Sequence, residues 1–260
     1  MIDVDRLPAA TTALGQLIRL PLYLIPRKTV VRILQGPLKG KRWVVGSGIH
    51  RLWLGSYESA KMRLARDLTS PGDVVFDIGA NVGVYSLLFS DCVGHDGQVV
   101  AFEPSPRNVN FLRLHLRLNS VDNVLVQEVA LSDVDGTARF GESDDPSIGR
   151  LDEYGGLEIT TRSVDSVVAE TGLVPQLLKI DVEGAELVVL LGASATLSRY
   201  QPRLLLATHS DEVKQACVDR LTAAGYVVHE IRTGGSVLED ELFALPATAG
   251  GAPTNLHHIN

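Results

Sequence analysis

Acidic side chains stand at the ends of three apolar segments of this chain. They are Asp77, Glu103 and Asp181, and each follows a short run rich in Val, Leu, Ile or Phe. Such runs are typical of buried parallel strands. The carboxyl ends of parallel strands meet at one edge of an open α/β sheet, where ligands bind, so we expect these carboxylates to border one site.

The first of these segments runs through a glycine-containing loop, residues 79–83, into a helical pattern. Strand, tight loop and helix N-terminus form the usual cradle of a nucleotide-like cofactor. Asp77 would attract the ammonium and sulfonium groups of S-adenosylmethionine but repel the pyrophosphate of NAD. The third glycine of G-x-G-x-x-G is also missing. We therefore predict S-adenosylmethionine, with S-adenosylhomocysteine as product, and keep an NAD-dependent oxidoreductase as the alternative.

Four residues shape the predicted cofactor loop: Gly79, Ala80, Asn81 and Gly83. The plain alternative is that the two glycines only permit a tight turn and close packing.

Further cofactor contacts are expected from the next two strands. Glu103 is the predicted ribose ligand, because an acid at the end of the second strand of a βαβ unit accepts hydrogen bonds from ribose hydroxyls. Pro104 and Ser105 follow it into the next helix. A third apolar strand, residues 123–131, is expected to border the adenine ring with Glu128 and Ala130. Turn residues without a ligand contact are an equal alternative there.

The acceptor is expected at the ends of the fourth and fifth strands. Asp181 and Glu183 would face the transferred methyl group, whereas Glu186 would only complement the dipole of the helix that it begins. His209 follows the fifth strand, and its pKa near neutrality suits the removal of a hydroxyl proton. We predict His209 as the base, with Asp181 and Glu183 as the other catalytic residues. These three could hold a divalent ion if they converge, but their spacing is no metal motif and no metal is predicted.

Three motifs together resemble the FkbM-type methyltransferases, a class I family dependent on S-adenosylmethionine. They are residues 77–83, 102–108 and 178–186, with weaker matches at 55–58 and 163–166, and the resemblance runs from Trp53 to Leu245. It implies methylation of a hydroxyl on a sugar, a glycan precursor or another secondary metabolite.

The chain departs from the family at one position. Ala207 stands where the family often has an acid, two residues before His209. The orientation of the imidazole is therefore left open, and a non-catalytic cofactor-binding or scaffold protein is a further alternative.

The whole pattern predicts an α/β, Rossmann-like class I methyltransferase fold. We expect a seven-stranded mixed sheet with helices on both faces and a small N-terminal extension. The expected divisions are an extension at 1–60, the methyltransferase domain at 61–248 and a flexible tail at 249–260. Helices are expected at 108–118, 186–198 and 212–224, and a closing hairpin of strands at 226–231 and 242–245.

Two segments keep two interpretations each. The apolar residues 14–25 are expected to pack on the domain, with a peripheral membrane contact as the alternative. Residues 30–45 suggest a small hairpin, and acceptor contacts are expected from the residues that follow it, Trp53, Tyr57 and Glu58. A role in the core is an equal alternative for the two aromatic residues. The polar residues 141–156 are either an active-site lid or a solvated loop.

Composition limits the possible partners. The net charge is −7 and the chain contains no basic tract, so nucleic-acid binding is not expected. Cys92 and Cys217 form no C-x-x-C pair and are expected as small buried side chains, which fits a reducing, cytoplasmic setting. The predicted partner is a small-molecule or glycan acceptor, and the sequence does not predict an oligomeric state.

Overall fold

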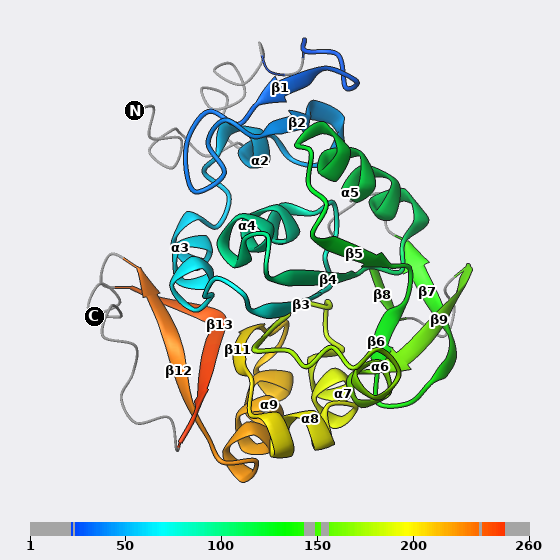
Figure 1. Cartoon of the computed structure of the whole chain (residues 1–260), viewed down its shortest axis with the longest axis vertical. Coiled ribbons are helices and arrows are strands. Elements are labelled where there is room, and N and C mark those ends of the chain that lie inside the picture. Colours follow the sequence, from blue (N-terminus) through cyan, green and yellow to red (C-terminus); the bar gives the residue numbers. More distant parts are fainter. Residues whose placement is uncertain (1–21, 23, 143–148, 152–155, 234–235, 248–260) are drawn as a thin grey trace.

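The computed structural model describes residues 22, 24–142, 149–151, 156–233 and 236–247 (Figure 1). Its main sheet consists of β3 (Val74–Ile78), β4 (Gln98–Phe102), β5 (Val124–Gln127), β10 (Leu177–Ile180), β11 (Arg203–Ala207), β12 (Tyr226–Thr233) and β13 (Ser236–Pro246). The strand order is β12-β13-β11-β10-β3-β4-β5. Strands β11 to β5 are parallel, and β13 pairs antiparallel with β11 and β12. This is the predicted seven-stranded mixed sheet, and its order reverses between β3 and β10.

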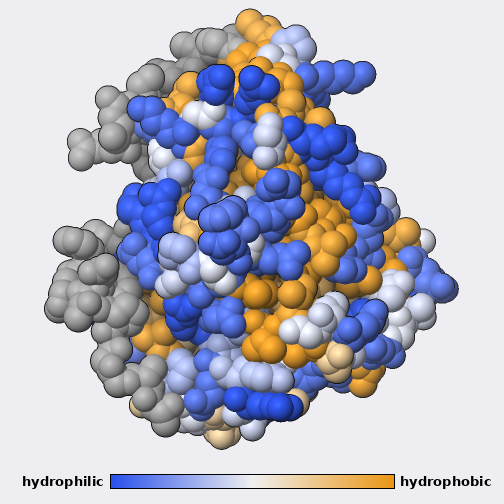
Figure 2. All heavy atoms as spheres, in the orientation of Figure 1, coloured by the Kyte–Doolittle hydropathy of each residue, from blue (hydrophilic) through white to orange (hydrophobic). Residues whose placement is uncertain are grey.

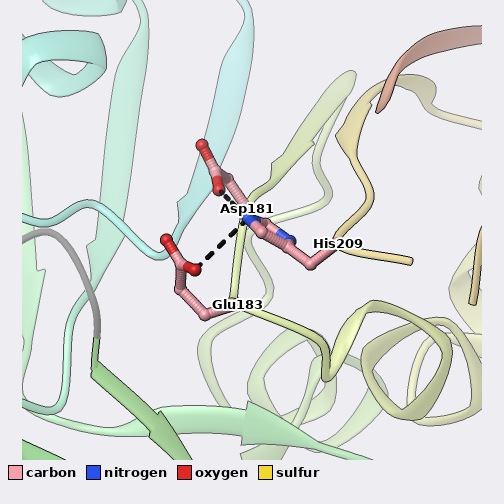
Figure 3. A group of neighbouring side chains, drawn as sticks. All are labelled: Asp181, Glu183 and His209. Atoms are coloured by element: carbon pink, nitrogen blue, oxygen red, sulfur yellow. Dashed lines mark ion pairs between the residues drawn. The ribbon is translucent and has the colours of Figure 1, made fainter. Parts of the chain in front are cut away.

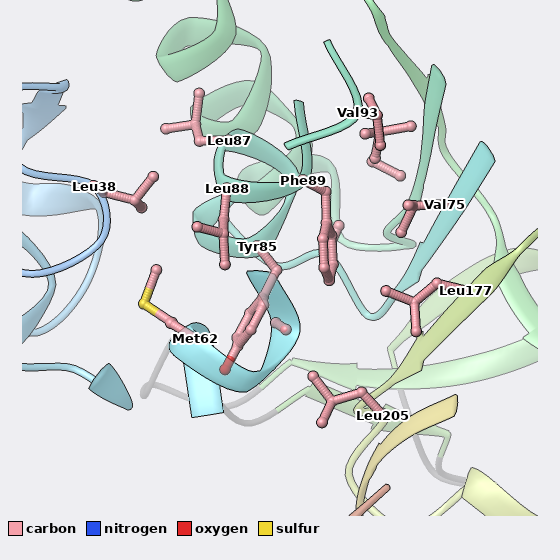
Figure 4. Packing of buried hydrophobic residues seen from close by; sticks show 14 of the residues in the cluster. Leu38, Met62, Val75, Tyr85, Leu87, Leu88, Phe89, Val93, Leu177 and Leu205 are labelled. Carbon is pink, nitrogen blue, oxygen red and sulfur yellow. The ribbon is translucent and has the colours of Figure 1, made fainter. Parts of the chain in front are cut away.

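Helices cover both faces of this sheet, as predicted. They are α3 (Ser59–Asp67), α4 (Val84–Val93) and α5 (Pro106–Leu118) on one face, and α6 (Val164–Thr171), α7 (Glu186–Leu191), α8 (Ser194–Tyr200) and α9 (Asp211–Ala223) on the other. Successive strand residues alternate between two cores, because side chains of a strand point to opposite faces. Val75 packs with Tyr85 and Phe89 of α4 (Figure 4), whereas Phe76 packs in the second core.

The N-terminal extension forms a small hairpin, as predicted. Strands β1 (Val30–Arg32) and β2 (Arg42–Val44) pair antiparallel, and a short 3-10 turn (Val45–Ser47) and α2 (His50–Leu54) follow. The extension is joined to α5 by His115, whose ring stacks on Trp43 at 3.7 Å between centroids.

The interpretations of residues 14–25 and 249–260 fall almost entirely outside the described residues. Within the described part of the chain, no helix has the length and apolarity that a membrane span requires. Over the face seen in Figure 2, hydrophilic and apolar side chains are interspersed.

The expected third strand is divided between two sheets, which corrects the prediction for residues 123–131. β5 ends the main sheet, and the chain then turns so that β6 (Ala130–Ser132) pairs with β9 (Leu157–Ser163). The second sheet has the order β6-β9-β7-β8, with β7 (Gly136–Glu142) and β8 (Gly149–Leu151). Part of the predicted loop 141–156 is therefore a strand pair, and the rest of that segment lies outside the described residues.

The predicted single helix over 186–198 is also wrong, because α7 and α8 are separate. Gly192 lies between them, and a Cβ at this residue would come within 2.0 Å of the Ser132 carbonyl oxygen. Asp165 then accepts hydrogen bonds from the backbone N–H groups of Ala195 and Thr196, each at 2.8 Å, and so caps α8. The helices predicted at 108–118 and 212–224 and the closing hairpin are confirmed within a few residues of their bounds, with longer strands in the hairpin.

Candidate active site

A cavity of about 400 Å³ opens at the carboxyl ends of the strands on both sides of the switch point between β3 and β10. This volume falls within the range of small-molecule sites. The predicted residues that line it are Tyr57, Glu58, Gly79, Ala80, Asn81, Glu103, Pro104, Ala130, Asp181, Glu183 and His209.

The other predicted site residues do not line the cavity, and for Glu128 and Trp53 the expected contact is wrong. The side chain of Glu128 is 47% exposed and forms an ion pair with Arg113, so the expected adenine contact is corrected. Trp53 is buried in the apolar core, where its Nε1 donates to Nδ1 of His50 at 3.1 Å. The expected acceptor contact from Trp53 is corrected as well, because its indole is buried in the core and does not line the cavity.

The backbone N–H groups of the loop after β3 are all engaged within the protein. The N–H groups of Gly79 and Ala80 both donate to the Phe102 carbonyl, at 3.0 and 2.9 Å. The N–H of Asn81 donates to Glu103 Oε2 at 2.8 Å, and that of Val82 donates to Asn81 Oδ1 at 2.7 Å. The N–H of Gly83 donates to the Ala80 carbonyl at 2.9 Å. Dinucleotide sites use N–H groups of this loop to bind pyrophosphate. Here they are already satisfied, which disfavours the NAD alternative independently of charge.

The two glycines of this loop are needed for its close packing. Gly79 has φ +73, and a Cβ there would lie 1.8 Å from the carbonyl oxygen of Asp181. Gly83 has φ +94, and its Cβ would meet Cδ1 of Leu112 at 2.4 Å. Only glycine combines this backbone conformation with such contacts. The turn therefore brings the predicted cofactor loop directly against the end of β10, and Gly83 supports it from behind the cavity lining.

Asp77 lies beneath the cavity rather than in its wall. Its side chain is 0% exposed and forms an ion pair with Nζ of Lys179 at 3.3 Å. Ser86 Oγ donates to its other oxygen at 2.6 Å, and Lys179 Nζ also donates to the Gly79 carbonyl at 2.8 Å. The expected direct contact between Asp77 and the ammonium group is corrected, because the carboxylate is neutralised by a buried lysine and helps to hold the loop.

Glu103 is positioned as predicted, at the end of β4 and in the cavity lining. Burial raises the pKa of its carboxyl group, and hydrogen bonds from Ser105, Asn81 and Asn108 oppose that shift. The backbone N–H of Ser105 donates to Oε1 at 3.0 Å, so Ser105 orients the carboxylate but does not itself line the cavity. Glu103 is thus a fixed, buried acceptor beside the loop that it also supports.

Asp181, Glu183 and His209 converge at the ends of β10 and β11 (Figure 3). Nε2 of His209 lies 3.7 Å from Oδ1 of Asp181 and 3.4 Å from Oε2 of Glu183. Burial by itself would raise the pKa of Asp181, but Lys61, Lys179 and His209 together hold it below its ordinary value. The three predicted catalytic residues therefore form one cluster in the cavity wall.

Glu186 provides the acid that sequence analysis did not find near His209. Its side chain is 0% exposed, and Nδ1 of His209 donates to its Oε1 at 2.8 Å. This hydrogen bond is the largest contribution that raises the pKa of His209 to about 9. His209 consequently carries a proton at neutral pH unless another cation replaces that proton. Its role as the base stays a prediction.

Sequence analysis missed Glu241, which lines the cavity, and its buried partner Lys61. Lys61 Nζ, in a side chain only 1% exposed, lies 2.7 Å from Oε1 of Glu241 and 3.7 Å from Oδ2 of Asp181. Burial lowers the pKa of Lys61, but Asp181, Glu58 and Glu241 outweigh it and raise the value. Burial raises the pKa of Glu241 to about 7. A lysine within an otherwise amphipathic helix offers no signal of this partner 180 positions along the chain.

Comparison with known proteins agrees with this geometry. The model of the methyltransferase FkbM domain matches residues 77–232. The chain belongs to the FkbM methyltransferase family. One relative is the hexuronic acid methyltransferase AglP of Haloferax volcanii, 31% identical over 54% of this chain and 58% of the relative. Another is the 31-O-demethyl-FK506 methyltransferase FkbM of Streptomyces tacrolimicus, 33% identical over 47% of this chain and 60% of the relative.

The chain therefore matches less than two thirds of the length of either relative. A solved FkbM methyltransferase from Methylobacillus flagellatus has the same fold, with a TM-score of 0.51 at 17% identity over 71% of this chain and 50% of that structure. The matched family is one of methyltransferases, in agreement with the predicted fold, and S-adenosylmethionine remains the predicted cofactor.

Proposed function

We propose that this FkbM-family methyltransferase transfers the methyl group to a hydroxyl oxygen of a sugar, a glycan precursor or another secondary metabolite. The observation that carries the proposal is the cavity that joins the cofactor loop to the Asp181, Glu183 and His209 cluster. One end offers a buried carboxylate and a loop without spare backbone donors. The other end offers acids and an imidazole at hydroxyl-binding distance from a common point.

At the cofactor end, the chain's own residues bind and orient. Glu103 accepts hydrogen bonds from the ribose hydroxyls, while Pro104 and Ala130 border the nucleoside. Gly79, Ala80 and Asn81 let the methionine part approach the backbone. Bound S-adenosylmethionine supplies an electrophilic methyl group on a positively charged sulfur, which suits a cavity wall rich in carboxylates.

At the acceptor end, alignment is the main task. Tyr57 and Glu58 of the segment before α3 line the same cavity and would hold the acceptor from the other side. The hydroxyl oxygen forms a bond to the methyl carbon as the bond from carbon to sulfur breaks, and the bonding pair leaves with the sulfur. The hydroxyl proton departs past the cluster of Asp181, Glu183 and His209 to water.

The acceptor class is supported by the substrates of the two relatives. One acts on a hexuronic acid and the other on 31-O-demethyl-FK506. Both substrates are oxygen-rich small molecules, so we extend this class to the present chain. A small-molecule or glycan acceptor also fits the cavity volume of about 400 Å³, part of which the cofactor fills.

The first experiment is calorimetric titration of the purified chain with S-adenosylhomocysteine, with NAD in parallel. We expect micromolar binding of S-adenosylhomocysteine, at least tenfold weaker binding in Glu103→Gln, and no NAD binding. The matched control is Glu128→Gln, an exposed carboxylate outside the cavity. Binding of NAD alone would revive the oxidoreductase alternative.

Acceptors are then found by screening sugars and metabolites with a labelled methyl donor. The scaffold alternative would be supported if the chain bound S-adenosylhomocysteine but transferred no label to any acceptor. Asp181→Ala and His209→Ala would then have no effect in the screen.

A further inference from the structure

The cluster of Asp181, Glu183 and His209 presents three potential ligand atoms to one point in the cavity wall. One ligand atom from each residue lies within 4.8 Å of the other two. The Nε2 atom of His209 is 3.4 Å from Glu183 and 3.7 Å from Asp181. Two ligands at right angles on a divalent cation lie about 3 Å apart when each bond is about 2.1 Å. Small side-chain rotations would therefore bring these atoms to coordination distance.

Asp181 and His209 are each held so that the converging atom stays directed inward. Oδ2 of Asp181 lies 3.7 Å from Lys61 and 3.8 Å from Lys179, which leaves Oδ1 toward His209. Nδ1 of His209 donates to Glu186 at 2.8 Å, which leaves Nε2 toward the two acids. The orientation of these atoms is thus fixed by neighbours that are themselves buried.

Glu186 is a second and independent feature typical of a metal site. Histidine ligands almost always donate their other ring N–H to a carboxylate or carbonyl, which fixes the tautomer and increases basicity. Glu186 is 0% exposed and lies outside the three converging residues, on the far side of the imidazole. Backbone N–H groups of Gly184 and Val182 donate to the same Oε1 atom, at 2.9 and 3.3 Å. The carboxylate therefore fixes both the histidine and the loop that carries Glu183.

The position of the cluster would place a bound ion next to the acceptor hydroxyl. Gly79 of the cofactor loop packs against the carbonyl of Asp181, so the cluster lies next to the cofactor end of the cavity. A cation that contacts a hydroxyl lowers the pKa of that hydroxyl and orients it. One nitrogen and two carboxylate oxygens suit manganese, magnesium or zinc, and the remaining positions stay open to the cavity.

We propose that Asp181, Glu183 and His209 bind one divalent cation, of the manganese or magnesium class, that holds the acceptor hydroxyl for methyl transfer. The catalytic part of this inference rests on the proposed function, whereas the binding site does not. The cation keeps its oxidation state throughout. The hydroxyl proton is released to water, the oxygen bonds to the methyl carbon, and the electron pair of the broken bond goes to sulfur.

The test is titration of the chelator-treated full chain with Mn²⁺. Binding is monitored through the electron paramagnetic resonance signal of the free aqueous ion, which decreases as the ion is bound. We expect saturable binding of one ion per chain. Glu183→Gln and His209→Ala should each weaken binding at least tenfold, and Glu186→Gln should weaken it by roughly tenfold, as outer-shell changes do. The matched control Glu212→Gln, an exposed carboxylate in the first turn of α9, should bind like the unchanged chain.

Binding of S-adenosylhomocysteine is measured on every variant, because it reports folding and the cofactor end separately. Glu183 is 29% exposed, so its substitution keeps the test valid if His209→Ala fails to fold. No saturable Mn²⁺ binding, or binding that these substitutions leave unchanged, would overturn the inference and leave His209 as an ion-paired side chain. Mn²⁺ binding without S-adenosylhomocysteine binding would keep the ion site and reject the proposed function.

Discussion

Glu186 at the start of α7 and His209 after β11 are joined by a hydrogen bond of 2.8 Å between a fully buried carboxylate and an imidazole. Family members often place an acid two residues before this histidine, where this chain has Ala207. The same orienting function is thus supplied from a neighbouring element across the sheet edge. The departure at Ala207 is therefore no evidence against catalysis.

Glu186→Gln should lower kcat for methyl transfer by roughly 10- to 100-fold, because the imidazole loses its charged orienting partner. S-adenosylhomocysteine affinity should stay within about twofold, since Glu186 does not line the cavity. Steady-state kinetics on an acceptor from the screen measures the change, with Glu212→Gln as the control. An unchanged kcat would show that His209 needs no orientation by Glu186.

Gly79→Ala should abolish S-adenosylhomocysteine binding, because the added Cβ would lie 1.8 Å from the Asp181 carbonyl oxygen. Gly172→Ala is the matched control: Gly172 is left-handed with φ +70, but a Cβ there meets nothing within 4 Å. Both variants bear the cost of a left-handed residue, about 1 kcal/mol, and only Gly79→Ala also clashes. Calorimetry and urea unfolding separate the two effects, and equal behaviour of both variants would contradict the close packing.

Lys179→Met should lower the free energy of unfolding by about 3–5 kcal/mol, because it leaves the buried carboxylate of Asp77 without its counter-ion. Lys179 is 2% exposed and Asp77 is 0% exposed, so water cannot compensate for the loss. The double variant with Asp77→Asn should recover a large part of that stability. Urea unfolding of both variants and of Asp77→Asn alone gives the coupling free energy. A double variant no more stable than Lys179→Met would contradict the pairing.

His115 should make the protein less stable in mild acid. Burial lowers its pKa from 6.5 to about 4, and the hydrogen bond from Nδ1 to the Val82 carbonyl opposes that shift only in part. Nε2 accepts the Val44 N–H, so protonation of this atom would break that hydrogen bond. The folded-state pKa lies below the unfolded value, so the contribution is fully present above pH 6.5 and is lost as the pH falls toward 4. Between pH 7 and pH 5 the loss amounts to about 2 kcal/mol.

Urea unfolding at both pH values measures this effect, and the reference is His115→Gln, which cannot titrate. The difference in pH dependence between the two proteins isolates this histidine from the carboxyl groups. Parallel pH profiles would contradict the prediction.

The main sheet was predictable because its signals are local. Buried parallel strands appear as continuous apolar runs, and the loop of Gly79 and Gly83 marks the switch point directly. Glu103 and Asp181 follow from their place at strand ends. The sequence around each of these residues is therefore enough to place it at the cavity.

The missed features depend on contacts between distant segments. Nothing near Lys61 indicates that Glu241 will neutralise it, and Glu186 has the pattern of an ordinary helix start. Likewise, residues 123–131 form one apolar run, and only pairing with β9 draws Ala130–Ser132 into a second sheet. Gly192 interrupts a helical pattern because the Ser132 carbonyl occupies the space beside it.

The saturated backbone of the loop after β3 also bears on competition inside a cell. ATP and other adenine nucleotides share the adenosine half of the methyl donor and are abundant. An enzyme whose loop N–H groups were free to bind phosphate would be inhibited by all of them. Here residues 79–83 offer no spare backbone donor to a phosphate, and the adjacent acids repel it. We therefore expect the loop to discriminate against adenine nucleotides because it offers no hydrogen bonds to their phosphates.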